Sequence, residues 1–337
     1  MKMASSYYMK TKAILFDAPG KVSLGEVTLP EPGPGQLLLK TLFSCISPGT
    51  EMRCLQGKQA GADDWPFIPG YATSAEVIAT GGGCELAEGT LVRCNGTQSA
   101  DVTCQWGGHI AHQVVNESSV QVIPEGCDPL DASIARIAAI AYHGVALARP
   151  RSHEKVAVIG LGPIGQFAAR CHHLAGAHVL GVDMDPRRVE ILKNAGVEAV
   201  VTTGSLREAL TPVFPGGVDI LVDATGFAPV MREAVELMRP LPWTPEPGEG
   251  PKYIIQGSYA DTFSMPYQEA FMNELEIRIP RDSTPGDLRA VMDFVARKRL
   301  LAKDLVSEVA TPDKAAEIYS RLGEKGTPLL TVAFDWS

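Results

Sequence analysis

The sequence lacks several features that would assign it to particular classes of protein. Its 337 residues carry a formal net charge of −9, so no basic excess is available to neutralise the phosphates of a nucleic acid. No apolar run approaches the roughly 20 residues that a membrane span needs. The first residues, MKMASSYYMK, have no apolar signal-peptide core, and the domain is expected to start at Met9. We therefore expect a cytoplasmic protein that binds neither nucleic acid nor membrane.

Closely spaced cysteine pairs are also missing. The seven cysteines are an odd number spread over a long chain, which is typical of reduced thiols in the cytosol. Cys84, Cys94, Cys104 and Cys127 have nine, nine and twenty-two residues between them. A closed tetrahedral zinc site normally needs close pairs of the C-x2-C kind. These four residues are therefore expected to be free thiols.

The composition is that of a globular protein with more than one core. Hydrophobic residues make up 45% and charged residues 20%, and 337 residues are too many for one ordinary core, so two domains are expected. Up to about residue 125, short β-like runs alternate with turn signals such as Glu31–Gly35, which predicts an irregular, barrel-like β domain. The runs are Lys12–Phe16, Gln36–Phe43, Ala75–Ala79, Thr90–Arg93 and Ile110–Val115.

The pattern changes at Asp131, where an alanine-rich apolar helix is predicted as far as Ala148. Apolar strands then alternate with helices, which predicts an α/β fold with a parallel sheet covered on both faces. Pro242–Pro251 carries four prolines and is expected to be a loop. The predicted elements are Lys155–Ile159, Gly165–Ala175, His178–Val182, Pro186–Ala195, Ala199–Val201, Asp219–Asp223, Val230–Met238, Tyr253–Gln256, Pro285–Lys298, Asp313–Gly323 and Leu329–Asp335.

A glycine-rich loop follows the strand Lys155–Ile159 and leads directly into a helix. In this G-x-G-x-x-G arrangement the first glycine permits a tight turn, the second lets the backbone approach a pyrophosphate, and the third allows the helix to pack on the strand. The phosphates would then lie at the positive end of the helix. The sequence thus predicts a Rossmann dinucleotide site formed by Gly160, Leu161, Gly162, Pro163, Ile164 and Gly165.

The choice of dinucleotide depends on the end of the next strand. Asp183 stands eighteen residues after Gly165, and a carboxylate there accepts hydrogen bonds from a ribose diol and repels a 2′-phosphate, which favours NAD. Arg187 and Arg188 keep NADP open as an alternative. Two later strand ends are expected to line the nicotinamide side, or else to be ordinary turns: Ala224, Thr225 and Gly226 in one, and Gly257, Ser258 and Tyr259 in the other.

The order of these parts resembles the medium-chain dehydrogenase/reductase superfamily. The resemblance spans nearly the whole chain, through Lys12–Gly20, Glu31–Gly35, Phe67–Gly70, Gly107–Ala111, the glycine-rich loop and Pro328–Trp336. It implies a GroES-like, partly open β-barrel catalytic domain over residues 1–130 and 299–337, and a Rossmann domain over residues 131–298. It also implies a homodimer that joins the Rossmann sheets edge to edge.

The departures from the family pattern concern zinc. Zinc-bearing members read G-I-C-G-T-D where this chain has Cys45–Glu51, so that Ser47 replaces a ligand cysteine and one residue is inserted. Tyr71 stands where those members have a ligand histidine, and the third ligand would fall near Arg136. Serine and tyrosine are poor zinc ligands, and the structural-zinc lobe is absent. The chain therefore resembles the zinc-less branch that includes bacteriochlorophyllide dehydrogenases, and no zinc is expected.

Without zinc, the substrate oxygen needs another hydrogen-bond or proton donor. The resemblance points to Tyr71, whose alternative is plain packing, with Ser47 and Thr50 beside it. Arg136 interrupts an apolar helix and needs a partner, either Glu51 or a substrate carboxylate. His143 is a candidate proton shuttle. The other histidines are expected to be half-exposed (His109, His112) or on a helix surface (His172, His173).

These observations predict an NAD(H)-dependent, zinc-independent oxidoreductase. It would transfer a hydride between nicotinamide and a secondary alcohol or ketone, for which the resemblance suggests a polyol, a sugar derivative or a hydroxyl-bearing natural product. Two alternatives remain. One is an NADPH-dependent enoyl or quinone reductase, against which Asp183 argues. The other is a catalytically inactive dinucleotide-binding sensor or scaffold.

Overall fold

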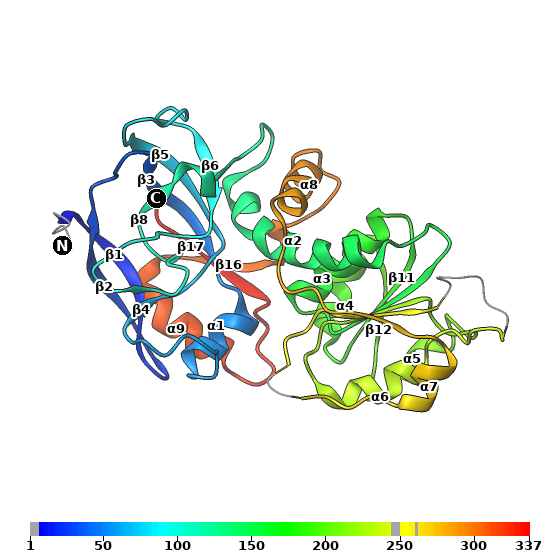
Figure 1. The fold of residues 1–337 in the computed structure, drawn as a ribbon. Coiled ribbons are helices and arrows are strands. Elements are labelled where there is room, and N and C mark those ends of the chain that lie inside the picture. The colour runs from blue at the N-terminus through cyan, green and yellow to red at the C-terminus, as the bar shows by residue number, and fades with distance from the viewer. Residues whose placement is uncertain (1–6, 244–249, 260–261) are drawn as a thin grey trace. The chain divides into compact units, whose positions relative to one another are not determined.

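The chain forms two structural units, seen in the computed structural model of Figure 1. The structure describes residues 7–243, 250–259 and 262–337, with the side chains of residues 7 and 8 left out. Unit 1 comprises residues 1–136, 295–297 and 302–337, and unit 2 comprises residues 137–294 and 298–301. Most of the predicted proline-rich loop Pro242–Pro251 lies outside the described residues.

Unit 1 is built on two β-sheets. One has the strand order β2-β1-β4-β7, and the other has the order β16-β17-β3-β5-β6-β9, with β8 also paired to β3. The last strand, β17, runs antiparallel to β3 with Ala333 opposite Cys45, so the end of the chain completes the sheet of the first half. The strands are β1 (Tyr7–Ala18), β2 (Lys21–Pro30), β3 (Gln36–Cys45), β4 (Phe67–Ile68), β5 (Thr73–Thr80), β6 (Leu91–Cys94), β7 (Thr103–Cys104), β8 (His112–Asn116), β9 (Gln121–Val122), β16 (Val306–Ala310) and β17 (Thr331–Asp335).

Two helices, α1 (Pro48–Leu55) and α9 (Ala315–Leu322), pack on the strands of unit 1. Phe16, Phe67, Tyr319 and Phe334 meet in the core between them, and all four are fully buried or nearly so. Burial of one such aromatic ring contributes about 2 kcal/mol to folding. Short 3₁₀ turns complete this unit at Glu117–Ser119, Lys303–Leu305 and Pro312–Lys314.

Unit 2 is a parallel six-stranded sheet with the order β12-β11-β10-β13-β14-β15. This 3-2-1-4-5-6 order is that of the Rossmann fold. Its strands are β10 (Lys155–Ile159), β11 (His178–Asp183), β12 (Glu198–Val201), β13 (Ile220–Asp223), β14 (Lys252–Ile255) and β15 (Glu276–Arg278). The central strands are buried along almost their whole length, which is why they read as continuous apolar runs in the sequence.

Helices alternate with these strands, as Figure 1 shows. They are α3 (Pro163–Leu174), α4 (Pro186–Asn194), α5 (Leu206–Leu210), α6 (Ala228–Glu236), α7 (Tyr267–Met272) and α8 (Pro285–Ala296), and α2 (Pro129–Ala148) precedes them. In the described part of the chain, α2 alone is long and apolar enough to cross a membrane by length and composition, and 67% of its most apolar window is buried inside the protein. That finding corrects the expectation that no segment approaches membrane-spanning length, and the burial is that of a core helix.

Three further expectations need correction. The first strand begins at Tyr7, ahead of the expected domain start at Met9 and of the predicted run Lys12–Phe16. His109 is completely buried rather than half-exposed, and His172 is 1% exposed rather than on the surface of its helix. Each correction arises because the partner segments that cover these residues are distant in the sequence.

Candidate active site

The glycine-rich loop between β10 and α3 has the geometry of a dinucleotide site. Gly160 has a φ of 85°, which strongly favours glycine. A Cβ on Gly165 would lie 1.7 Å from the carbonyl oxygen of Gly160, whereas a Cβ on Gly162 would have no neighbour within 4 Å. Gly165 is therefore required for the helix to pack on the turn, and Gly162 faces open space. Pro163, Ile164 and Gly165 form the first turn of α3, where backbone N–H groups remain for an anion.

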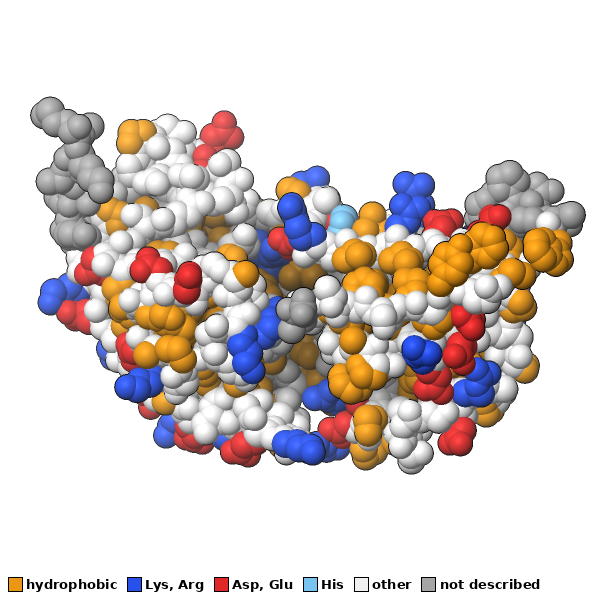
Figure 2. Space-filling model, turned by 60° about the horizontal axis from the view of Figure 1, so that its bottom comes forward, with side chains coloured by type: hydrophobic (Ala, Val, Ile, Leu, Met, Phe, Trp, Pro, Cys, Tyr) orange, Lys and Arg blue, Asp and Glu red, His pale blue; other side chains and the backbone are white. Residues whose placement is uncertain are grey.

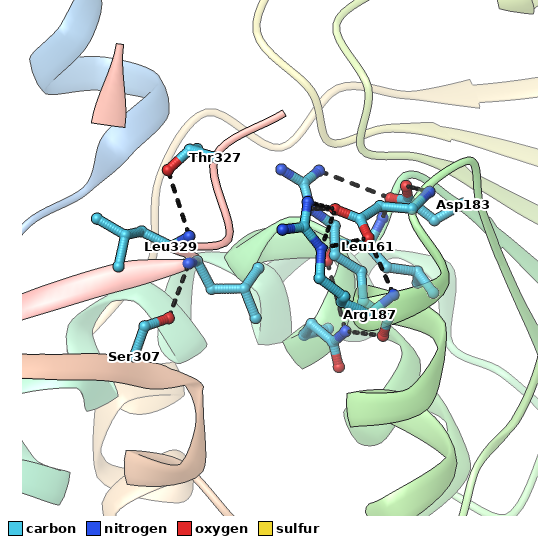
Figure 3. Close-up of polar contacts among 10 residues, drawn as sticks. Leu161, Asp183, Arg187, Ser307, Thr327 and Leu329 are labelled. Atoms are coloured by element: carbon cyan, nitrogen blue, oxygen red, sulfur yellow. Dashed lines mark hydrogen bonds and ion pairs between the residues drawn. The ribbon is translucent and has the colours of Figure 1, made fainter. Parts of the chain in front are cut away.

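Asp183 binds the same loop directly. Its Oδ2 accepts a hydrogen bond from the backbone N–H of Leu161 at 2.6 Å, and its Oδ1 accepts one from Asp185 at 2.8 Å. Arg188 lies 3.7 Å from Asp183 Oδ2, while Arg187 donates to both oxygens of Asp185. Figure 3 shows Asp183, Leu161 and Arg187 gathered at this point. A carboxylate is thus fixed at the end of β11, and both arginines have acidic neighbours.

The two later turns meet the glycine-rich loop. A Cβ on Gly257 would lie 2.3 Å from the backbone nitrogen of Gly226, and one on Gly226 would lie 2.5 Å from the carbonyl oxygen of Ser258. Thr225 borders Gly160 and Ala224 borders Gly165 in the same way. The structure therefore brings all the predicted cofactor-binding turns together at the carboxyl ends of the parallel strands, where ligands bind in this type of sheet.

A buried carboxylate, Asp223, holds these turns together. Asp223 Oδ1 accepts hydrogen bonds from the backbone N–H and the hydroxyl of Thr225 at 2.9 and 2.6 Å. Its Oδ2 accepts from the hydroxyls of Tyr253 and Tyr259. Burial, with the adjacent carboxylate, raises the pKa of both tyrosines, so they remain donors. Tyr259, predicted to line the nicotinamide, is therefore bonded to Asp223.

In unit 1, Tyr71 is the centre of a compact hydroxyl cluster. Its hydroxyl donates to Ser47 Oγ at 2.6 Å, and Thr50 Oγ1 lies 3.3 Å away. Ser47 precedes α1 and Thr50 lies in its first turn, so the start of this helix places both hydroxyls opposite the tyrosine. Tyr71 is 8% exposed, and burial raises its pKa. The structure thus brings together three of the predicted site residues and keeps Tyr71 neutral.

Arg136 lies over the ring of Tyr71, with its Cζ 5.7 Å from the ring centre, close enough for a cation–π contact. Its Nε donates to Asn95 Oδ1 at 3.2 Å. The suggested partner Glu51 is occupied by other groups, which corrects that alternative. Arg93 donates to the same Asn95 oxygen and to the carbonyl of Tyr71. Both arginines therefore support the Tyr71 segment.

Glu51 is fully buried, and its carboxylate belongs to a network that the sequence did not reveal. One oxygen accepts the N–H of Ser47 at 2.7 Å. The other lies 2.9 Å from His109 Nε2 and accepts a bond from the hydroxyl of Tyr319. His109 Nδ1 is 2.8 Å from Ser44 Oγ. Glu51 thus fixes the turn that carries Ser47.

His143 lies in unit 2, where its Nδ1 is 2.9 Å from Asp287 Oδ2. The same oxygen accepts hydrogen bonds from the backbone N–H and hydroxyl of Thr284 at 2.8 and 2.7 Å, at the start of α8. These bonds form a capping arrangement that anchors α8. His143 therefore contacts Asp287, the carboxylate that caps α8. The proton-shuttle role of His143 stays a prediction.

The donor set around Tyr71 is poorly suited to zinc. It consists of neutral hydroxyls and a guanidinium, whereas zinc prefers thiolate, imidazole and carboxylate. Among the residues that the structure describes, no group of three or more His, Cys, Asp or Glu side chains could hold a metal ion. The arrangement can instead donate hydrogen bonds to a substrate oxygen.

Comparison with known proteins places these features in a family. A family model described as zinc-binding dehydrogenase matches residues 163–241, a segment that contains none of Ser47, Tyr71 and Arg136. The 2-desacetyl-2-hydroxyethyl bacteriochlorophyllide A dehydrogenase of Rhodobacter capsulatus is 26% identical over 97% of this chain and 99% of its own. These matches support the resemblance of the chain to the medium-chain dehydrogenase/reductase superfamily. A sorbitol dehydrogenase of Halalkalibacterium halodurans is 22% identical over 93% of this chain and 96% of its own.

Solved structures of this superfamily share the fold. A Sinorhizobium meliloti protein described as a zinc-binding dehydrogenase, solved with NADP bound, has a TM-score of 0.84 at 21% identity, covering 97% of this chain and 100% of its own. An Escherichia coli CFT073 protein described as a short chain alcohol dehydrogenase, solved with NADH, has a TM-score of 0.83 at 20% identity, covering 97% of this chain and 99% of its own. These structures show the fold that the chain shares with them, and one holds NADP and the other NADH. The relatives in sequence are alcohol dehydrogenase-like oxidoreductases.

Proposed function

We propose that this medium-chain oxidoreductase works without zinc, using NAD(H) to interconvert a secondary alcohol and a ketone. The observation that carries the proposal is the hydrogen bond between Tyr71 and Ser47, in the cluster that also contains Thr50. Neutral hydroxyls, those of Ser47 and Tyr71, stand at two of the three positions at which the resemblance places zinc ligands. Small molecules with a hydroxyl or carbonyl group are therefore the proposed substrates.

In the direction of reduction, a hydride reaches the carbonyl carbon and a proton must reach the carbonyl oxygen. The dinucleotide supplies the hydride when it is bound. Tyr71 supplies the hydrogen bond, and the proton as charge develops on the substrate oxygen, because a phenol with an ordinary pKa of about 10 is protonated at neutral pH and burial raises the pKa of Tyr71 further. Ser47 and Thr50 accept from that hydroxyl in the free protein, and their hydroxyls could relay a proton taken up from solvent back to Tyr71 after the reaction.

The preference for NAD(H) is supported by Asp183. The hydrogen bonds from Leu161 and Asp185 hold its carboxylate at the end of β11, where it would accept from a ribose diol and repel a 2′-phosphate. Arg187 is engaged by Asp185, which weakens the case for an NADPH-dependent reductase. Arg188 is the residue that would bind the 2′-phosphate of NADPH, and its ion pair with Asp183 would have to break for it to do so.

We further propose that the protein acts as a homodimer in a reducing compartment. β15 is an edge strand of the sheet of unit 2, and exposed hydrophobic side chains surround it: Phe271 at 61%, Ile277 at 39% and Ile279 at 61%. Figure 2 shows hydrophobic side chains gathered on the part of unit 2 at the right of the view.

The proposed reducing compartment rests on a different observation. All seven cysteines are free thiols, which suits the cytoplasm. Sedimentation velocity of Ile279→Lys would test the dimer, with dissociation expected.

Turnover with purified, chelator-treated protein tests the proposed function. NADH oxidation with a panel of ketones, and NAD reduction with the matching secondary alcohols, should proceed at the same rate before and after chelation. Reduction of enones or quinones with NADPH, and no activity with alcohols, would support the alternative reductase instead. Dinucleotide binding without turnover of any member of the panel would support a sensor or scaffold.

A further inference from the structure

We propose that unit 1 binds a carboxylate group of the substrate in a pocket beside Tyr71, so that the substrate is a hydroxy acid or oxo acid. The pocket has a volume of about 310 Å³ and is lined by Asn95, Gln98, Cys104, Trp106 and Ser119 among others. The inference rests on the proposed function and adds the chemical class of the substrate to it.

The pocket is directly connected to the Tyr71 cluster by two of its walls. The indole ring of Trp106 meets the ring of Tyr71 edge to face, with the ring centres 5.2 Å apart. Asn95 accepts the hydrogen bond from Arg136, whose guanidinium lies over the same tyrosine. A ligand held in the pocket would therefore lie next to the side chains that support the tyrosine hydroxyl.

The backbone conformation of Trp106 indicates that this side of the pocket is held in a fixed position. Its φ of 68° lies in the left-handed region, which costs a bulky residue on the order of 1–3 kcal/mol. A Cβ on Gly96 would lie 2.3 Å from the carbonyl oxygen of Trp106, so the two backbone segments are in close contact. These contacts keep the indole between the pocket and Tyr71.

The hydrogen-bonding capacity of the walls indicates what they recognise. The oxygen of Asn95 is occupied by Arg93 and Arg136, and the oxygen of Gln98 accepts the backbone N–H of Asn116 at 3.0 Å. In the part of the chain that the structure describes, neither amide NH₂ group has a partner. The side-chain amides of Asn95 and Gln98 can therefore offer a ligand only N–H donors. A carboxylate, which only accepts hydrogen bonds, matches them.

The charges around the pocket favour the same ligand. Arg93 and Arg136 are 4% and 8% exposed and converge on one amide oxygen, so their charge polarises the Asn95 amide and strengthens its N–H donors. At the other end of the pocket, burial and, to a smaller extent, the negative charge of Asp101 raise the pKa of Cys104 to about 11. An anionic group would therefore bind at the Asn95 end of the pocket rather than at the Cys104 end.

The experiment compares oxo acids with neutral ketones of the same chain length. 4-Oxopentanoate, 5-oxohexanoate and 6-oxoheptanoate are paired with 2-pentanone, 2-hexanone and 2-heptanone, and kcat/KM is measured with NADH. The test variants are Asn95→Asp and Gln98→Glu, which keep the accepting oxygens for their partners and replace each NH₂ group by a second oxygen. Gln59→Glu is the matched control, because Gln59 also accepts from an arginine, Arg53, and lies outside the pocket lining.

The proposal expects at least one oxo acid to exceed its neutral partner by about tenfold or more in kcat/KM, as a charge-assisted contact would provide. Asn95→Asp should reduce this ratio by about tenfold or more, Gln98→Glu should reduce it as well, and Gln59→Glu should leave it unchanged. An oxo-acid preference that both pocket variants retain, or no preference in the unmodified protein, would overturn the proposal.

A separate measurement distinguishes failure of the pocket from failure of the proposed function. If no ketone is reduced, calorimetric titration with 5-oxohexanoate and 2-hexanone measures binding alone. Selective binding of the oxo acid that Asn95→Asp abolishes would support the pocket and contradict only the proposed reaction. If the oxo acid fails to bind in preference to the ketone, the pocket proposal is wrong whatever the enzyme does.

Discussion

The hydroxyl of Tyr71 donates a hydrogen bond to Ser47 Oγ over 2.6 Å, and both side chains are buried in unit 1. Glu51 fixes the backbone N–H of that serine, and Arg136 lies over the ring of the tyrosine. The tyrosine is therefore oriented from both sides, which is what a proton donor to a substrate oxygen needs.

Tyr71→Phe should lower kcat by about 10²- to 10⁴-fold, because it removes the proposed proton donor. Dinucleotide affinity should be unchanged, since the glycine-rich loop lies in unit 2. Steady-state kinetics and a fluorescence titration with NADH would measure the two quantities. Tyr142→Phe, which also removes one tyrosine hydroxyl, is the control and should retain full activity. Equal rates for both variants would exclude Tyr71 as the donor.

Asp183→Asn should shift the dinucleotide preference from NADH toward NADPH. Removal of the negative charge removes the repulsion of a 2′-phosphate and frees Arg188 from its ion pair. We expect the ratio of the two dissociation constants to change by about tenfold or more, a typical effect of losing one charged contact. Asp313→Asn makes the same change of charge in unit 1 and should leave the ratio unaltered. Tighter NADPH than NADH binding in the unmodified protein would contradict the assignment.

His172 should make the protein less stable in acid. Burial, with a smaller effect of Lys252, lowers its pKa from 6.5 to about 3, and neither ring nitrogen has a hydrogen-bond partner in the described structure. Between these pH values the unfolded chain binds a proton that the folded protein excludes. The contribution of this residue to the free energy of unfolding therefore falls as the pH is lowered from about 6.5 toward 3.

His172→Leu should flatten that pH dependence, because leucine has no proton to take up on unfolding. Urea unfolding at several pH values between 4 and 7 would measure it. His173→Leu is the matched control, because His173 is the more accessible neighbour on the same helix. If both variants keep the pH dependence of the unmodified protein, His172 is not its source.

Glu51→Gln should destabilise unit 1 by about 2 kcal/mol or more. In the native protein, one carboxylate oxygen of Glu51 contacts both His109 Nε2 and the hydroxyl of Tyr319, and the side chain is completely buried. The NH₂ group of the new glutamine would place a donor against the donor of one of these two residues. Denaturant unfolding would show the loss, and Glu317→Gln on the exposed face of α9 should cost little. Unchanged stability of Glu51→Gln would mean that the network does not support the site.

Much of this architecture could be predicted from the sequence because the signals are local. The apolar run Lys155–Ile159 matches β10, and the glycine spacing identifies the dinucleotide loop because it follows this strand, leads into a helix and is followed by Asp183 at the next strand end. β2 was not predicted: its four buried or half-buried aliphatic side chains, Val22, Leu24, Val27 and Leu29, form two short alternating pairs, and Gly25 and Glu26 interrupt the alternation between them. Its pairing with β1 determines its conformation.

The candidate site could be predicted only in part. Ser47, Thr50 and Tyr71 were identified from departures from a family pattern, and the structure brings them together. The partners of Glu51 could not be predicted, since Tyr319 is 268 residues away along the chain. Asn95 was missed for the same reason. Its importance arises from two arginines that only the folded chain brings to one oxygen.

The central claim is that Tyr71 replaces zinc, and metal analysis combined with turnover of the same sample tests it most directly. Purified protein is dialysed against a chelator, its zinc content is measured, and NADH-dependent ketone reduction is assayed with and without added zinc. Our account predicts full activity at negligible zinc and no gain when zinc is added. Stoichiometric zinc that survives dialysis, or activity that disappears with the metal and returns with it, would contradict the account.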